Sequence, residues 1–441
     1  MDESKRIIRA RFLAERNALS GEDRSEKSAE ICRRILACEE FRRARVVMLY
    51  RSVRSEVSLE GLTDAEPGGE KIFLWPRCGR NGVMDAVLPE GGHFAYARRD
   101  VPSYANCDYT GGPPLKFIHA LDAESISFTG AGAIDGNEKI FYGEITGDHI
   151  EGLFYPRMPL LYTENVQGFA MRGVTLQHSA FWTVHLVGCR GVRIDGITIN
   201  NTLCMANCDG IDPDACRDVT ITHCRITSAD DCIVLKTTQA AAQYGPCRNI
   251  RVSDCELTSK SAAFKIGSES EALFTDIDVG RCVIRGTNRA ISLQLRDRGS
   301  IENARFHHMR IDTHLCDPRG WWGKAEPVAI TANRRYPDTE IGHIRNVSFE
   351  NIAAEAEGGI VIVGDALAQN IDGIRFRDCS FRLRRATDWP VGTLDIRPGV
   401  GDTLQRRPLR HVTVEHAQNV RWEGVTFSED EAMGALMEKS E

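Results

Sequence analysis

The sequence predicts an all-β parallel β-helix, preceded by a partial α/β domain. Strand-like segments with alternating apolar residues recur between residues 95 and 430, mostly 24 to 31 residues apart, with Gly, Asn or other polar residues at the expected corners. Such a repeat cannot bury its apolar face alone and is typical of a solenoid. The length of 441 residues agrees, because it exceeds that of one ordinary compact domain.

Residues 1–90 predict an α/β fragment. Apolar residues at three- and four-residue spacing over residues 5–44 predict two helices joined at LSGEDRS, with Ser20 as N-cap and Asp23 three residues later. The runs VVMLYRS and KIFLWPR predict two strands, and Leu59 and Leu62 lie in a predicted short helix between them. This order of elements is the start of an α/β domain.

The same segment resembles the N-terminal half of 5-formyltetrahydrofolate cyclo-ligase. The shared motifs are R-N-A-L-S, K-S-A-E-I, S-E-V after the first strand, and W-P-R. The resemblance implies that Lys5 and Arg9 contact nucleotide phosphates and that Glu56 lies in a folate pocket. That family's phosphate loop, G-x-G-x-G-x-Y-D, is absent from this chain. We therefore expect a truncated or fused remnant that caps the β-helix, with cyclo-ligase activity as the alternative.

Eight segments define the repeat. The apolar residue after each opening polar pair serves as a marker, and the markers are Val166, Val192, Val219, Ile250, Ile277, Ala304, Val347 and Ile371. No L-x-x-L-x-L pattern accompanies them, which disfavours a leucine-rich repeat. Cysteines recur at equivalent places in VTITHC, IRVSDC and IDVGRC, so Cys224, Cys255 and Cys282, like Cys189, are predicted to be reduced core residues. Without a CxxC pair, neither a zinc site nor a disulfide framework is expected.

Composition and charge limit the classes of function that the sequence allows. Hydrophobic residues make up 42% and charged residues 27%, which is typical of a soluble globular protein. A net charge of -7 gives no general attraction to nucleic acid or to an anionic membrane. The N-terminal residues lack the uninterrupted apolar core of a secretory signal, so we expect a cytoplasmic protein.

Carboxylates gather in NCDGIDPDACRDVTITHCRITSADDCIVLK. Asp209 and Asp231 are 22 residues apart, close to one coil, so they are predicted to stack about 4.8 Å apart beside Asp230. Carboxylates brought together repel one another, which raises the pKa of one and leaves another ionised. Hydrolysis of a glycosidic bond needs this division into an acid and a base. We interpret Asp212 and Asp214 as corner residues in Asx-turns.

The motifs N-C-D-G-I-D, D-D-C-I-V-L-K, G-A-G-A-I-D-G, F-W-T-V-H and I-G-S-E resemble those of glycoside hydrolase family 28, the polygalacturonases and their relatives, over about residues 95–430. The resemblance implies a right-handed, pectin-lyase-like β-helix and a hydrolysis that inverts the anomeric centre. It implies Asp230 as general acid, and Asp209 and Asp231 as the residues that hold and deprotonate water. Two features depart from the family: no G-H-G precedes I-G-S-E, and Ser292 and Gln294 occupy the Arg and Lys positions of R-I-K.

Further side chains are predicted to bind substrate. Alternation in AAFKIG turns Phe264 and Ile266 inward and Lys265 toward solvent, one coil after Lys236. Paired Trp in an insertion loop could stack on a sugar ring or plug a coil edge. His185 and Glu269 are lesser candidates, and a core histidine is the commoner outcome for His185. The predicted substrate-binding residues are Lys236, Lys265, Glu269, Arg289, Arg296, Trp321, Trp322 and His185.

The sequence therefore predicts an inverting glycoside hydrolase with altered substrate subsites, acting on pectin-like or related oligosaccharides. It needs no cofactor or metal, because protons and water are the only other participants. The predicted partner is the oligosaccharide, with no nucleic acid and no membrane. A catalytically silent carbohydrate-binding β-helix and a lyase or epimerase are the alternatives.

Overall fold

The computed structural model describes residues 12, 15–43, 46–49, 57–64, 72–78, 84–87, 116–146, 149–151, 157–318 and 320–438. The chain divides into two compact units. One comprises Met1–Tyr96 with Glu124–Ser127, and the other comprises Ala97–Ala123 with Phe128–Glu441.

The N-terminal unit contains α2 (Gly21–Ala37), α3 (Glu39–Arg43), β1 (Val46–Met48), α4 (Glu60–Asp64), β2 (Ile72–Cys78) and β3 (Met84–Val87). The second predicted helix is divided at Cys38 into α2 and α3, and a strand, a short helix and a strand follow as predicted. β3 was not predicted, and the first predicted helix lies largely outside the described residues. Ser20 caps α2 as predicted, because its Oγ accepts from the Asp23 amide at 3.0 Å. β1 and β2 are parallel, and β3 returns antiparallel to β2. Leu62 packs in a small core with Cys32 and Phe41. Lys5, Arg9 and Glu56 lie outside the described residues.

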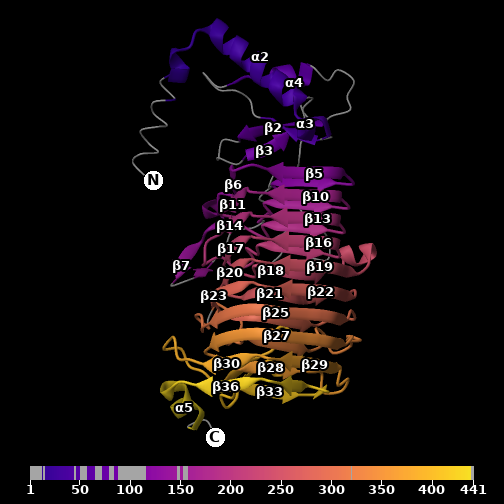
Figure 1. Cartoon of the computed structure of the whole chain (residues 1–441), viewed down its shortest axis with the longest axis vertical. Coiled ribbons are helices and arrows are strands. Elements are labelled where there is room, and N and C mark those ends of the chain that lie inside the picture. The colour runs from indigo at the N-terminus through magenta and orange to yellow at the C-terminus, as the bar shows by residue number, and fades with distance from the viewer. Residues whose placement is uncertain are drawn as a thin grey trace. The chain divides into compact units, whose positions relative to one another are not determined.

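The second unit is a stack of parallel strands that form a β-helix (Figure 1). A ten-stranded sheet, which we call the site sheet, forms one side. In spatial order its strands are β4 (Ile118–Leu121), β9 (Leu161–Glu164), β12 (Val184–Val187), β15 (Ile211–Asp214), β18 (Ile233–Thr237), β21 (Ala262–Ser270), β24 (Arg289–Leu295), β26 (Val328–Ala332), β28 (Ile360–Val363) and β33 (Val412–Glu415).

A 19-stranded sheet completes the coils in two bent columns. The first column contains β5 (Glu124–Thr129), β10 (Gln167–Arg172), β13 (Arg190–Asp195), β16 (Arg217–Thr222), β19 (Cys247–Ser253), β22 (Phe274–Gly280), β29 (Ile371–Arg377), β34 (Ala417–Gln418) and β35 (Arg421–Glu423). The second contains β6 (Ala133–Asp135), β11 (Thr175–Gln177), β14 (Thr198–Asn200), β17 (Arg225–Ser228), β20 (Glu256–Ser259), β23 (Val283–Thr287), β30 (Ser380–Leu383) and β36 (Thr426–Glu429). β25 (Ile301–Thr313) and β27 (Ile344–Ala356) run through both columns.

The remaining elements stand off these sheets. Two short antiparallel pairs, a C-terminal helix and two 3-10 turns decorate the coils: β7 (Glu144–Thr146), β8 (His149–Glu151), β31 (Thr393–Asp395), β32 (Leu404–Arg406), α5 (Glu431–Glu438), η1 (Glu138–Phe141) and η2 (Ala241–Tyr244). In the described part of the chain, no helix is both long and apolar enough to cross a membrane. The cytoplasmic location stays a prediction.

The register confirms most of the repeat and corrects its two ends. Val192, Val219 and Ile250 pair in succession as predicted. Val347, however, pairs with Ile374 rather than with Ile371, and Gln167 pairs with Arg190, which places Phe169 opposite Val192 and leaves Val166 one apolar position early. The cause is a second inward residue three positions before each marker. A residue in the left-handed conformation, such as Gly168 or Gly373, separates the two and breaks the alternation.

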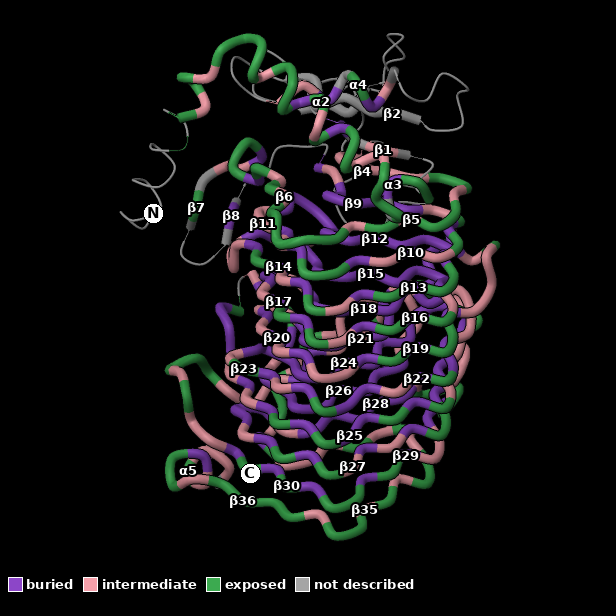
Figure 2. The backbone as a smooth tube through the Cα atoms, turned by 45° about the horizontal axis from the view of Figure 1, so that its top comes forward, coloured by how far each residue is buried: buried purple, intermediate pink, exposed green. Residues whose placement is uncertain are grey.

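Stacked side chains fill the core. Phe306, Phe349, Phe376 and Trp422 form a ladder with ring centroids 5.2, 4.6 and 4.3 Å apart. Cys224, Cys255 and Cys282 are buried as predicted and free of disulfides. Figure 2 shows the buried positions running along the strands of the site sheet, where all residues of β12, β15, β18 and β24 are buried. Both faces of that sheet are therefore covered over these coils.

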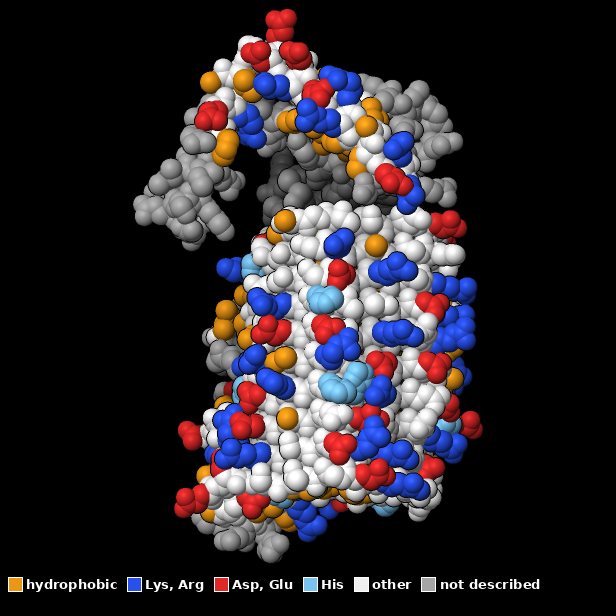
Figure 3. Space-filling view, viewed as in Figure 1, with side chains coloured by type: hydrophobic (Ala, Val, Ile, Leu, Met, Phe, Trp, Pro, Cys, Tyr) orange, Lys and Arg blue, Asp and Glu red, His pale blue; other side chains and the backbone are white. Residues whose placement is uncertain are grey.

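The outer face of the 19-stranded sheet carries charges of both signs (Figure 3). Arg305, for example, contacts Asp278 at 3.7 Å and Glu350 at 2.8 Å on the neighbouring strands. Cross-strand pairs of this kind leave no field of one sign on the face shown.

Candidate active site

Three carboxyl groups meet at the corners that precede two neighbouring strands of the site sheet. Ile211 of β15 pairs with Ile233 of β18, so Asp209 and Asp231, each two residues earlier, are neighbours in successive coils. The Gly210 amide donates to the Asp231 carbonyl at 2.8 Å, which fixes this stacking. The one-coil spacing expected from the sequence is thus observed. Asp230 and Asp231 lie in the corner between β17 and β18.

Asp231 is held by three donors. Its Oδ1 accepts from the Ser261 hydroxyl at 2.9 Å and from the Ala262 amide at 3.1 Å, and its Oδ2 accepts from Lys265 Nζ at 2.7 Å. The residue is 1% exposed. A buried carboxyl that accepts three hydrogen bonds, one of them from a cation, is stabilised in its charged form.

Asp230 is the one of the three that is only half-buried. Its oxygens accept from the backbone amides of Asn207 at 2.8 Å and Asp231 at 3.1 Å. Burial raises the pKa of Asp230, and the negative charge of Asp231 raises it further, while Lys265 offsets part of this rise. Asp230 is therefore suited to hold a proton where solvent or a ligand can receive it.

A buried arginine fixes the loop that holds Asp230. Arg157 donates to the Asn207 side chain at 2.9 Å and to the Ala180 carbonyl at 3.1 Å. Asn207 has a φ of 60°, in the left-handed region that asparagine tolerates better than most residues. Neither Arg157 nor the backbone role of Asn207 was anticipated, because Arg157 lies far from the acidic motif in sequence.

Asp209 belongs to a second group around Lys236. Lys236 Nζ lies 3.2 Å from Glu269 Oε2, 3.6 Å from Asp209 Oδ2 and 3.9 Å from Asp212 Oδ1. Burial raises the pKa of Asp209 well above its usual range, and the charges of Asp212 and Asp230 add to this. Burial opposes the charge on Lys236, but Glu269 and Asp209 outweigh it, so the pKa of Lys236 is raised and the amine stays a cation.

Asp212 and Asp214 are not corner residues, contrary to our interpretation. Both lie in β15 and are completely buried. Asp214 accepts from the Thr238 hydroxyl at 2.7 Å and contacts His185 Nε2 at 3.2 Å. Because alternation turns Ile211 and Pro213 inward, the outward placement of both Asp could have been predicted from the sequence.

His185 and Lys265 differ from their predicted roles. His185 is 2% exposed and bonded to Asp214, and burial lowers its pKa, so it is a neutral core histidine rather than a substrate ligand. Phe264 and Ile266 do point inward. Lys265 does not project into solvent, because its side chain, 16% exposed, folds back onto Asp231.

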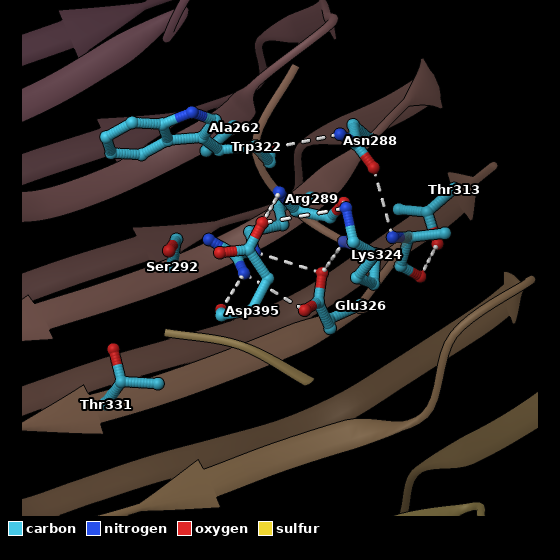
Figure 4. Close-up of polar contacts among 12 residues, drawn as sticks. Ala262, Asn288, Arg289, Ser292, Thr313, Trp322, Lys324, Glu326, Thr331 and Asp395 are labelled. Carbon is cyan, nitrogen blue, oxygen red and sulfur yellow. Dashed lines mark hydrogen bonds and ion pairs between the residues drawn. The ribbon is translucent and has the colours of Figure 1, made fainter. Parts of the chain in front are cut away.

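The two predicted arginines also serve the protein itself. Arg289 forms a bidentate pair with Glu326, both bonds being 3.0 Å, and Figure 4 shows this pair beside Asp395 and Lys324. The prediction for Arg296 is wrong. Arg296 is fully buried and donates to the carbonyls of Thr331 at 3.0 Å and Ile396 at 2.9 Å, among others, so no substrate can reach it.

The two tryptophans have opposite environments. Trp321 is 3% exposed and packs with Phe141, Ile150 and Met205. Trp322 is 46% exposed, and the guanidinium of Arg397 lies 4.8 Å from its ring centroid. Trp321 therefore plugs the coil edge, and Trp322 keeps a ring that could stack on a sugar.

Neutral polar side chains follow the carboxyl groups along the site sheet. Ser292 pairs with Lys265 across the strands and accepts from Gln294 Nε2 at 3.1 Å. Both residues are buried. Within the described ranges, no three His, Cys, Asp or Glu side chains are arranged to hold a metal ion.

Comparison with known proteins shows which families the chain is similar to. Residues 102–312 match the model of the family described as Glycosyl hydrolases family 28. The resemblance of the β-helix to family 28 is thereby confirmed. Residues 1–94 match the 5-formyltetrahydrofolate cyclo-ligase family, which confirms the second resemblance.

Polygalacturonases are among the similar proteins. A probable polygalacturonase of Vitis vinifera is 30% identical over 186 residues, which are 41% of this chain and 37% of the relative. Exopolygalacturonase B of Aspergillus niger is 32% identical over 271 residues, 56% of this chain and 59% of the relative. The chain thus spans between about a third and three fifths of the length of these two relatives.

A solved structure supports the fold. The exopolygalacturonase of Thermotoga maritima superposes with a TM-score of 0.54 at 21% identity, over 71% of this chain and 72% of that chain. The predicted fold class, a right-handed parallel β-helix, is confirmed.

Proposed function

We propose that the β-helix is an inverting glycoside hydrolase that cleaves pectin-like or related oligosaccharides. One observation carries this proposal: two neighbouring carboxyl groups in the same corner have opposite environments. Asp231 is bound by Lys265 and two further donors, whereas burial raises the pKa of the half-buried Asp230. An ionised base and a protonated acid therefore stand side by side.

The chemistry follows from these environments. Asp230 gives its proton to the glycosidic oxygen as the bond from that oxygen to the anomeric carbon breaks. Asp231 and Asp209 orient a water molecule, whose oxygen bonds to the anomeric carbon from the opposite face. The proton of this water passes to one of these two carboxylates. The product sugar then has inverted configuration. The similarity to family 28 and to several polygalacturonases supports the same reaction class.

The subsite beyond the carboxyl groups is proposed to differ from that of a strict polygalacturonase. Ser292 and Gln294 bring no charge to this row of the site sheet. Lys265, the cation in register with Ser292, already binds Asp231. We therefore propose a substrate in which other sugars alternate with galacturonate or replace it, as in pectin-derived rhamnogalacturonides.

The test is a screen of purified protein against galacturonides and rhamnogalacturonides of defined length, following the release of reducing ends. Asp230→Asn should lower the rate of release by at least about 10³-fold, because the general acid is lost while the shape of the side chain is kept. Asp195→Asn is the matched control, since Asp195 is a half-exposed carboxylate on the opposite sheet. Proton NMR of the first product should show the inverted anomer. Release that survives in Asp230→Asn would refute the proposed site.

A further inference from the structure

Asp212 is a carboxyl group that the proposed reaction does not use, although it is completely buried beside Asp209. Neither of its oxygens, nor Oδ1 of Asp209, accepts a hydrogen bond from any residue that the structure describes. The two carboxyl groups lie against the same amine, because Lys236 Nζ is 3.6 Å from Asp209 Oδ2 and 3.9 Å from Asp212 Oδ1. Two carboxylates only accept, so a contact between them becomes a hydrogen bond only if a proton lies between them.

Counting charges leads to the same requirement. Asp209, Asp212, Asp230, Asp231 and Glu269 surround two lysines, Lys236 and Lys265. Arg335 also acts on Glu269, but its charge is paired with that of Asp297. If all five carboxyl groups were ionised, this buried cluster would carry three uncompensated negative charges. Burial makes that state costly. One proton on Asp230 and one within the Asp209 and Asp212 pair reduce the excess to a single negative charge.

We propose that Asp209 and Asp212 hold one proton between them, which makes Asp212 a positioning residue that keeps the free oxygen of Asp209 directed at the attacking water. This inference rests on the proposed hydrolysis. Lys236 lies against both carboxyl groups and is their shared counter-charge.

Every strand packed around Asp212 contributes to its environment. β12 contributes His185, which is in register with Asp212, and β15 itself contributes Asp214. β18 contributes Lys236, and β21 contributes Glu269. His185 and Asp214 bond to each other, so Lys236 is the cation nearest to the pair. Burial raises the pKa of Asp212, and Lys236 offsets part of that rise.

The sign of two substitutions follows from this arrangement. In Asp212→Asn, Asp209 loses a negative neighbour and gains an amide donor, so it ionises at lower pH. The acid limb of the kcat/KM profile for oligosaccharide hydrolysis should shift down by about one pH unit or more. In Lys236→Met the pair loses its cation, and the same limb should shift up. KM should change less than about twofold in Asp212→Asn, because Asp212 does not touch substrate.

Glu357→Gln is the control for the loss of a buried carboxylate elsewhere. Glu357 is fully buried and accepts from the amides of Leu315, Ala386 and Thr387. Loss of the Glu357 carboxylate should lower thermal stability and leave the acid limb of the kcat/KM profile in place. An unshifted limb in a folded Asp212→Asn variant would overturn the proposal, because a purely structural role predicts that result.

An infrared measurement tests the shared proton without any substrate. Protein carrying isotopically labelled Asp carboxyl groups should show the absorption of protonated Asp at neutral pH. This absorption should persist in Asp230→Asn, because the pair still holds its proton. Its disappearance in Asp230→Asn would overturn the shared proton. Persistence of the absorption, together with no hydrolysis of any oligosaccharide by the native protein, would refute the proposed function and leave the shared proton standing.

Discussion

Replacing Arg296 with methionine tests whether this residue holds the fold together or binds substrate. Its guanidinium is fully buried and donates to the carbonyls of Leu295, Thr331, Ile396 and Pro398. Methionine keeps the stem but leaves these acceptors without their donor. Each buried group left unsatisfied costs about 1–3 kcal/mol, and local relaxation recovers part of it. We expect a total loss of about 3–5 kcal/mol, the range seen when a buried charged network is broken.

The loss converts into a change of melting temperature. The unit that contains Arg296 has on the order of 340 residues, and unfolding entropy near 60 °C is about 2.1 cal/mol/K per residue, or about 0.7 kcal/mol per degree in total. Arg296→Met should therefore melt about 4–7 °C lower in calorimetry. KM should not change. Arg298→Met is the matched control, because Arg298 is 70% exposed and pairs with Glu271 at the surface, so its loss should leave Tm in place. An unchanged Tm together with a raised KM in Arg296→Met would refute the structural role.

Three other predictions concern residues around the site. Lys265→Met should lower kcat about 10²-fold and leave KM within about threefold, because Lys265 binds Asp231 rather than the sugar. A raised KM at unchanged kcat would instead show that Lys265 binds substrate. Trp322→Ala should raise KM about fivefold at constant Tm, whereas Trp321→Ala should destabilise by about 3–5 kcal/mol and leave KM unchanged in the folded fraction. Burial acts to raise the pKa of Glu269, but Lys236 and Arg335 lower it to about 2. Its stabilising effect is therefore complete above about pH 4.5 and is lost as the pH falls toward 2, so Glu269→Gln should be less acid-sensitive than the native protein over this window.

The repeat could be predicted because one-coil neighbours leave a period in the sequence. Asp209 and Asp231 are 22 residues apart and stack, and Cys224, Cys255 and Cys282 occupy equivalent core positions, as expected. The ends of the repeat were misplaced by three residues because two inward positions per strand fit the same pattern. Periodicity therefore locates coils well, but it does not distinguish two equivalent anchors within one coil.

The fate of the charged side chains could not be predicted in the same way. Arg296 is fixed by Ile396 and Pro398, and Arg289 contacts the carbonyl of Asp395, about one hundred residues away in each case. These partners come from an irregular segment that carries no repeat. A lysine or arginine on an outward position of a coil is exposed only if no such segment covers it, and covering segments leave no periodic signal.

The same stacking that builds the fold also explains why the site is confined to two coils. Extending the register of the site sheet gives one column of equivalent positions, which runs Trp182, Asp209, Asp231, Ala262, Arg289 and Glu326. Trp182 closes the column on one side with a buried ring, over which Lys236 Nζ lies at 4.2 Å. Ala262 contributes only its amide to Asp231, and Arg289 and Glu326 neutralise each other. A carboxyl group added at position 262 would stack between Asp231 and the Arg289 pair and extend the column of negative charge. Alanine instead of a carboxyl group at position 262 therefore leaves a single ionised base beside a single proton donor.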